Sequence, residues 1–211
     1  MPDLAASIAG RLAAVRARTL ELIAPLDDDA LHGSPDPIMS PPVWDLGHIA
    51  AYEELWLVSR LSGAPSLHPG LAQVYDAFET PRAVRGSVAM LDAPESREYL
   101  RRVRERTLDA LAGADLGDDG PALTRGGLVF DMVVQHEAQH TETMLQALQL
   151  MPAGRYVPPV ARRLPGAAPG GDGMVHVPGG PFVMGAGAAR FAYDCERPAH
   201  VREVAPFRIA R

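Results

Sequence analysis

Four stretches of the chain repeat apolar residues at the spacing of an α-helix, and this periodicity constrains the fold more than any other feature. The stretches cover residues 4–24, 40–61, 95–113 and 127–151. In each of them, apolar side chains recur every three or four residues and therefore gather on one face. Helices with one apolar face bury those faces against one another. The sequence thus predicts a mainly α protein built on an antiparallel four-helix bundle, an architecture whose facing helices can hold a metal between them.

Residues at the ends of these stretches fit helix starts and stops. Ser40 is predicted to be the N-cap of the second helix, with Pro41 in the first helical position, where its missing N–H costs nothing. The fourth helix is expected to stop before Pro152. The connection over residues 62–94 is too long for a simple turn between bundle helices, and residues 71–78 are a candidate short helix within it.

The composition changes after the fourth helix. Residues 152–172 are dense in proline and glycine, which predicts an extended linker. Residues 173–211 carry short strand-like runs, and about forty residues are too few to bury a core alone. We therefore expect three parts: a helical bundle with a metal site over residues 1–151, the linker, and the incomplete start of an α+β domain that ends within a strand-like pattern.

Charge and cysteine content exclude several classes of function. The 211 residues have a formal net charge of -6, which argues against a nucleic-acid-binding surface. The single cysteine, Cys195, cannot form a disulfide within the chain, which fits a reducing cytoplasm. Arginines run through the first helical stretch, so it resembles neither a signal peptide nor a membrane span. We expect a cytoplasmic protein without nucleic-acid or membrane partners.

The fourth helix contains a pair of histidines at metal-binding spacing. The segment from His136 to His140 reads H-E-x-x-H, the motif of zinc metalloproteases, with Glu137 in the position of the general base. Positions i and i+4 lie on one helix face, so both rings can reach one metal ion. The rest of that stripe is apolar and comprises Val129, Val133, Met144, Ala147 and Met151. A pair of histidines in an apolar stripe favours a metal site over ordinary core packing.

The second helix supplies a third inward-facing histidine. His48 shares its predicted stripe with Trp44, Ala51, Leu55 and Val58. Three histidines from two helices form a three-nitrogen site that leaves open positions for water, oxygen or substrate. The remaining histidines lie in loop-like or strand-like contexts and are not expected to be ligands: His32, His68, His176 and His200.

A protease fits this context poorly. The extended protease motif needs glycine at position 143 and histidine at position 146, where this chain has Thr143 and Gln146. A proline- and glycine-rich segment follows the motif, where the glutamate-ligand variant would need a second acidic helix. Because His48 offers a third nitrogen, we expect Glu137 to lie beside the metal ligands or on the flank of the helix rather than to act as a base.

Two segments resemble the N-terminal, DinB-like domain of the sulfoxide synthases of ergothioneine biosynthesis, the hercynine oxygenases. They read MSPPVWDLGHIAAYEELWL and VVQHEAQHTETMLQALQLM. The later segments VHVPGGPFVMGA and FAYDCERPAHVREVAPFRI are similar to the opening of that family's second domain, which has the formylglycine-generating-enzyme, C-type-lectin-like fold. The resemblance implies one non-haem Fe(II) bound by His48, His136 and His140, with O2 as co-substrate. Histidines alone do not select the metal, since Zn(II), Co(II) and Ni(II) suit the same donors.

The resemblance also implies a reaction and its substrates. Hercynine (Nα-trimethylhistidine) would be joined through an imidazole carbon to the sulfur of γ-glutamylcysteine or cysteine, giving a sulfoxide. Arg82 and Arg85 match a pair expected to clamp the carboxylates of the thiol, which favours γ-glutamylcysteine, because an arginine fork binds a carboxylate through two hydrogen bonds. On the residues alone, two loop arginines are more typical of a solvated surface. Gln139 matches the residue that approaches hercynine.

The second domain of that family supplies a proton-donating tyrosine, so no catalytic residue is expected within these 211 residues. Tyr193 is not expected to be that tyrosine, and Cys195 is interpreted as a neutral substitution. We expect this chain to be an N-terminal portion that binds one divalent metal and turns over poorly by itself. Two alternatives stay open: a stand-alone DinB-like thiol S-transferase, against which the C-terminal tail argues, and a metal-binding remnant without activity.

Overall fold

The computed structural model describes residues 4–159, 173–187 and 191–210. The chain divides into two compact units, Met1–Pro159 and Val160–Arg211. We refer to the first as the helical unit and to the second as the strand unit, and each is described by itself.

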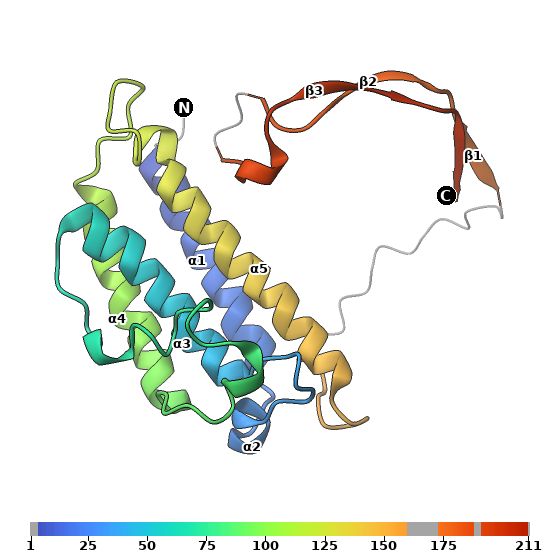
Figure 1. Ribbon diagram of the computed structural model, residues 1–211. Coiled ribbons are helices and arrows are strands. Elements are labelled where there is room, and N and C mark those ends of the chain that lie inside the picture. Colours follow the sequence, from blue (N-terminus) through green and yellow to red (C-terminus); the bar gives the residue numbers. More distant parts are fainter. Residues whose placement is uncertain (1–3, 160–172, 188–190, 211) are drawn as a thin grey trace. The chain divides into compact units, whose positions relative to one another are not determined.

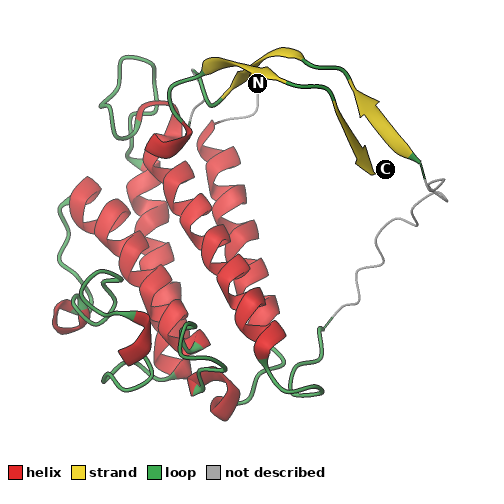
Figure 2. Ribbon diagram, turned by 45° about the vertical axis from the view of Figure 1, so that its right-hand side comes forward, coloured by secondary structure: helices red, strands yellow, loops and turns green. Residues whose placement is uncertain are grey.

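The helical unit is built on long helices that lie side by side (Figures 1 and 2). Helix α1 packs against α5, and α3 packs against both α4 and α5. The four predicted helices are present, with ends that differ from the prediction by one or two residues, and α3 is continued by a π-helix. The short helix α2 was not predicted. The helices are α1 (Leu4–Ile23), α2 (Asp28–His32), α3 (Pro42–Glu53), α4 (Ala93–Ala112) and α5 (Leu128–Leu150).

Two apolar clusters fill the helical unit. The larger one surrounds Trp44 and Tyr99, and the smaller one surrounds Ile8, Leu57 and Phe130. All five side chains are at most 2% exposed. Burying side chains of this size supplies the main driving force for packing the helices, at about 1.5–3 kcal/mol for each. The predicted stripe of α5 contributes Val129 and Val133 to the smaller cluster and Met144 to the larger one.

Helix α3 begins one residue later than predicted. Its first residue is Pro42, and Pro41 occupies the N-cap position without a side-chain hydrogen bond to the helix. The predicted cap, Ser40, is buried, and its Oγ accepts a hydrogen bond from Nη1 of Arg85 at 2.9 Å. The prediction of a Ser40 cap is therefore wrong, because a tertiary contact uses this hydroxyl.

The continuation of α3 departs from α-helical geometry. Residues Glu54–Arg60 form a π-helix, a rare and wider helical turn that is frequent at functional sites. Leu55, predicted to be buried on the stripe of His48, is 43% exposed. It lines a pocket instead of packing in the core. That prediction is wrong because α3 and its continuation face an open cavity at Leu55, whereas Val58 of the same stripe is buried in the core.

The connection between α3 and α4 also differs from the prediction. Residues 71–78 do not form an α-helix; a 3-10 turn, Pro69–Leu71, is followed by single hydrogen-bonded turns. A helix this short gains little by itself, and tertiary bonds compete with it. One of them is the hydrogen bond from Nε1 of Trp44 to the carbonyl oxygen of Val74, at 2.9 Å. The loop is thereby tied to α3.

The strand unit contains two antiparallel pairs. Strand β1 (Met174–Val177) pairs with β4 (Phe207–Ala210), and β2 (Gly180–Met184) pairs with β3 (His200–Val204). The predicted strand-like character of these runs is confirmed. Of the predicted linker over residues 152–172, the part from 160 onwards lies outside the described residues. Within the described chain, none of the helices combines the length and apolar character needed to cross a membrane.

Candidate metal centre

The three histidines selected from the sequence come together in the helical unit. One ring nitrogen from each of His48, His136 and His140 lies within 4.8 Å of the other two. Nε2 of His48 and Nε2 of His136 are 3.2 Å apart. A metal ion that binds imidazole nitrogens at about 2.0–2.1 Å needs its ligand atoms about 3–4 Å apart, so small ring rotations suffice. Among the described residues, no other group of histidine, cysteine and acidic side chains meets this criterion.

The protonation of these rings suits metal binding. Burial, and secondly the neighbouring ring of His140, lower the pKa of His48 to about 4 and the pKa of His136 to about 2. Both imidazoles are therefore neutral near pH 7. A neutral imidazole carries the lone pair that a metal requires.

His48 is held on two sides. Its Nδ1 donates a hydrogen bond to the carbonyl oxygen of Tyr75 at 2.6 Å, which fixes the tautomer and leaves the lone pair on Nε2. The indole of Trp44, one turn earlier on α3, stacks on the imidazole with ring centroids 4.9 Å apart and an interplanar angle of 12°. The ring orientation is thus set before any metal binds.

The two histidines of α5 are held by residues of α3. Nδ1 of His140 lies 3.2 Å from Oδ1 of Asp45, a carboxylate that is 2% exposed. The ring of Tyr52 stacks on His136 with centroids 3.6 Å apart. Asp45 lies three residues before His48, and Tyr52 lies four residues after it. This is the spacing of residues that share one face of a helix. Sequence reasoning did not select either residue, although that spacing next to His48 was the available signal.

Glu137 lies outside the histidine cluster. Its carboxylate accepts hydrogen bonds from Nε of Arg16 at 2.7 Å, from Oγ1 of Thr19 at 2.8 Å and from Nη2 of Arg104 at 3.2 Å. The residue is 1% exposed. Both carboxylate oxygens of Glu137 are thus engaged by side chains of α1 and α4.

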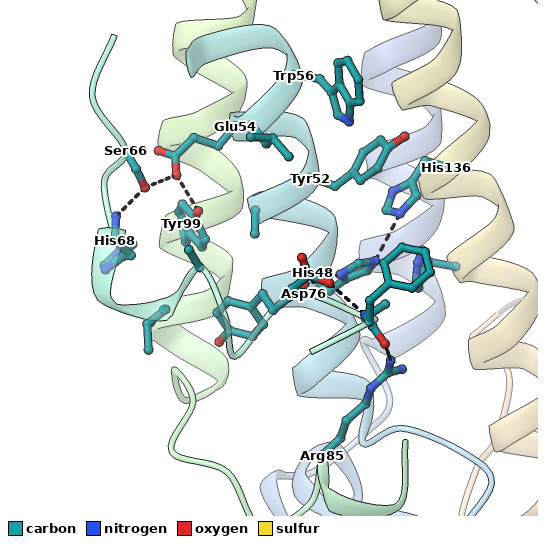
Figure 3. A pocket seen from close by; sticks show the side chains of 18 of the residues that line it. His48, Tyr52, Glu54, Trp56, Ser66, His68, Asp76, Arg85, Tyr99 and His136 are labelled. Carbon is teal, nitrogen blue, oxygen red and sulfur yellow. Dashed lines mark hydrogen bonds between the residues drawn. The ribbon is translucent and has the colours of Figure 1, made fainter. Parts of the chain in front are cut away.

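A pocket of about 880 Å³ opens beside the three histidines (Figure 3). Pockets of this size accommodate small-molecule ligands. Arg82, Arg85 and Gln139, the residues that the resemblance assigns to substrate binding, all line it. The pocket is thus bounded by α3 and its π-helical continuation, by α4 and α5, and by the loop that connects α3 to α4.

The two arginines differ in their surroundings. Arg82 is exposed, and its Nη1 donates to the carbonyl oxygen of Ile38 at 3.1 Å. Arg85 is buried and stacks over Trp44, with Cζ 3.7 Å from the ring centroid. Three of its five N–H donors contact protein acceptors: Oγ of Ser40 and the carbonyl oxygens of Ala77 and Thr80. Arg85 therefore also stabilises the folded conformation of the loop that carries it.

A polar group that the sequence did not indicate lines another part of the pocket (Figure 3). Oε2 of the buried Glu54 accepts hydrogen bonds from the hydroxyls of Ser66 at 2.6 Å and Tyr99 at 2.7 Å. His68 packs edge-to-face on Tyr99. Burial and the adjacent Glu54 raise the pKa of Tyr99. His68 thus contributes to the pocket without joining the histidine cluster.

Of the histidines in the described residues, only His48, His136 and His140 make up the cluster. His32 is the last residue of α2, His176 is in β1 and His200 is in β3.

The chain is similar in sequence to a known superfamily and to several curated proteins. Residues 11–144 match the family model of the DinB superfamily. The chain is 44% identical to the hercynine oxygenase of Mycolicibacterium smegmatis over 215 aligned residues, which cover 97% of this chain and 47% of that protein. It is 45% identical to the hercynine oxygenase of Mycolicibacterium thermoresistibile, covering 98% of this chain and 45% of that protein. It is 46% identical to the hercynine oxygenase of Mycobacterium tuberculosis, covering 97% of this chain and 47% of that protein. The chain thus spans about half the length of the curated relatives it matches.

Proposed function

The chain belongs to the DinB superfamily, and on this basis we propose that it forms the metal-binding part of a hercynine oxygenase. The observation that carries the proposal is the three-histidine cluster beside a pocket, in a chain 44% to 46% identical to proteins of that name. In this proposal the helical unit is a four-helix bundle of the DinB type. The strand unit belongs to a C-type-lectin-like domain of the whole protein.

The metal that we assign to the cluster is Fe(II), held by His48, His136 and His140. Bound Fe(II) would supply the activation of O2 that oxidative C–S bond formation requires. The neutral rings, with the tautomer of His48 fixed by Tyr75, fit this role, because three imidazoles leave coordination positions open for small molecules. Zn(II), Co(II) and Ni(II) would fit the same donors.

The proposed reaction is balanced by one molecule of O2. Hercynine loses the hydrogen on its imidazole carbon and the thiol loses its S–H hydrogen as the C–S bond forms. One oxygen atom ends on the sulfur as the sulfoxide, and the other leaves as water with the two hydrogens. The site must therefore hold both substrates at once, and proximity of this kind lowers the barrier by removing the entropic cost of their encounter.

The residues of this chain would bind and orient the substrates. We propose that Arg82 and Arg85 bind the carboxylates of γ-glutamylcysteine, with cysteine as the alternative thiol. The two N–H groups of Arg85 beyond those bonded to protein are the donors that we assign to this contact. Gln139, one residue before His140, would orient hercynine. We assign no proton-donating residue within this chain and propose turnover for the whole protein and metal binding for the present chain.

A DinB-like thiol S-transferase is the second candidate, and the superfamily match alone would suit it. The similarity to hercynine oxygenases favours the first candidate, because it covers 97% of the chain and so extends beyond residues 11–144. A metal-binding remnant would bind Fe(II) but give no sulfoxide in the whole protein.

Anaerobic Fe(II) titration tests the metal site. The wild-type chain is expected to bind one equivalent, and His48→Ala and His140→Ala are expected to lose stoichiometric binding and to retain only weak affinity. His68→Ala is a matched control, since His68 lines the same pocket outside the cluster. Unchanged binding by His48→Ala would refute the three-histidine site. The whole protein would then be assayed with hercynine, γ-glutamylcysteine and O2, and absence of the sulfoxide would refute the proposed reaction.

A further inference from the structure

Four charged side chains form a closed ring of ion pairs in the core of the helical unit. Arg16 of α1 and Arg104 of α4 each contact both Glu53 of α3 and Glu137 of α5. The distances between charged atoms are 2.7 Å from Arg16 to each carboxylate, and 2.7 Å and 3.2 Å from Arg104 to Glu53 and Glu137. We call these four residues the charge ring. It takes one member from each long helix.

The charge ring is fully paired despite its burial. Glu53 and Glu137 are 0% and 1% exposed, and the side chains of Arg16 and Arg104 are 10% and 12% exposed. Burial alone would raise the pKa of Glu53, but the two guanidinium groups outweigh it and lower that pKa. The two guanidinium groups thus stabilise the ionised form of Glu53. Buried ion pairs add little stability compared with apolar packing, but they fix a geometry because each bond is directional.

The charge ring and the metal-binding face use neighbouring residues of the same two helices, α3 and α5. Glu53 follows Tyr52 in the chain, and Glu137 follows His136. Tyr52 and His136 form the closest ring stack between α3 and α5, with centroids 3.6 Å apart and an interplanar angle of 9°. Each residue of this stack is thus followed in the chain by a glutamate of the charge ring. A rotation of α3 against α5 would break both the stack of Tyr52 on His136 and the ion pairs of the charge ring.

We propose that the charge ring positions the metal ligands, and that Glu137 is a positioning residue that holds His136 and His140 at the distance from His48 that one metal ion needs. The glutamate of the H-E-x-x-H segment would then act through helix placement and not through chemistry on a substrate. This inference rests on the metal site of the proposed function. It adds residues of α1 and α4, two helices that contribute no ligand.

The test compares Co(II) binding with stability in the full chain. Co(II) replaces Fe(II) as the probe because its visible absorption reports ligand geometry. Glu137→Gln keeps the size of the side chain and removes its charge. We expect this variant to lose at least tenfold in Co(II) affinity and to show a shifted absorption spectrum. Urea unfolding in the presence of a chelator measures the stability of the metal-free chain separately.

Asp131→Asn is the matched control. Asp131 lies on the same helix, is 7% exposed and pairs with Arg11 of α1, but it is more than one turn from His136. We expect this variant to lower stability and to leave Co(II) affinity within about twofold of wild type. Equal losses of affinity in both variants would overturn the inference, because they would show a general effect of destabilisation. Wild-type affinity and spectrum in Glu137→Gln would also overturn it.

A milder variant keeps the test valid if Glu137→Gln does not fold. Thr19→Val removes the hydrogen bond from Oγ1 to Glu137, at 2.8 Å, and leaves the four charges in place. It is expected to weaken Co(II) binding by two- to threefold with a smaller spectral shift, and an unchanged affinity and spectrum would count against the proposal. If the wild-type chain bound no Co(II), the proposed metal site itself would be at fault, so the two failures are distinguishable.

Discussion

The contact between Asp45 and His140 leads to a quantitative prediction about metal affinity. Nδ1 of His140 lies 3.2 Å from Oδ1 of Asp45, and the two side chains are 16% and 2% exposed. A carboxylate that accepts the N–H of a ligating imidazole fixes its tautomer and increases its basicity. Loss of such a partner typically weakens metal binding by about 10- to 100-fold, which corresponds to about 1.4–2.8 kcal/mol.

Two substitutions of Asp45 separate charge from hydrogen bonding. Asp45→Asn can still accept a hydrogen bond, and the wild-type contact is long, so we expect a loss near the lower limit, about tenfold. Asp45→Ala leaves Nδ1–H without this acceptor in a mostly buried position, which costs about 1–3 kcal/mol, so its loss should approach 100-fold. The assay is anaerobic Fe(II) titration against a chromophoric chelator, with urea unfolding of the metal-free chain as a check on folding.

The decisive comparison uses an altered ligand. In a His140→Ala background, Asp45→Asn should change the residual metal affinity by less than about twofold, because its partner is absent. If Asp45→Asn binds Fe(II) as tightly as wild type, or weakens binding equally in both backgrounds, then Asp45 does not act through His140 and the reasoning fails.

Three further predictions concern pH, packing and substrate affinity. Lowering the pH from 7 to 5 should destabilise the metal-free chain by about 1–2 kcal/mol for each of His48 and His136, measured by urea unfolding, because unfolded imidazoles bind protons with a pKa of about 6.5. In the folded chain these rings have pKa values of about 4 and about 2, so stability is greatest above pH 6.5 and falls as the pH drops. Gly47→Ala should cost about 1–3 kcal/mol, seen as a lower melting temperature, since a Cβ there would lie 2.2 Å from ring atoms of Tyr75. Arg82→Ala should change stability by less than about 0.5 kcal/mol but raise the KM for γ-glutamylcysteine at least tenfold in the whole protein.

Each of these has a result that would contradict it. Stability that is unchanged or higher at pH 5 would mean that the two imidazoles are protonated in the folded chain. Gly47→Ala with wild-type stability and metal affinity would show that the Tyr75 ring moves freely. An unchanged KM in Arg82→Ala would remove Arg82 from the thiol site, with Arg125→Ala, an exposed arginine of another loop, as the control.

The helices and the three histidines could be predicted because both depend on local spacing. The apolar repeat fixes which face of α5 is inward, and His136 and His140 lie on that face whatever the rest of the chain does. Leu55 shows the limit of this reasoning, since periodicity gives a direction but does not say whether a core or a cavity lies there. Ser40 likewise has the right type for a cap, but its hydroxyl bonds Arg85, which is 45 residues away in the chain.

The residues that hold the three histidines in place are brought together by contacts between segments that are far apart in the sequence. The charge ring could not be derived from periodicity, because a hydrophobic pattern predicts only where apolar residues are buried. It does not say where charged residues such as Arg16, Glu53 and Glu137 lie or with which residues they pair. The carbonyl oxygen of Tyr75 carries no side-chain signal at all, and its role follows only from the path of the loop. The sequence therefore indicates ligands better than it indicates what orients them.

The loop that carries the two arginines is fastened to the helix that carries a metal ligand. Val74 and Tyr75 accept hydrogen bonds from the side chains of Trp44 and His48. In thermodynamic terms, metal binding and loop ordering are then linked equilibria. A thiol that orders the loop should tighten metal binding by the same factor by which the metal tightens thiol binding. Metal binding and thiol binding would thus be cooperative through a single imidazole, without a moving domain between the two sites.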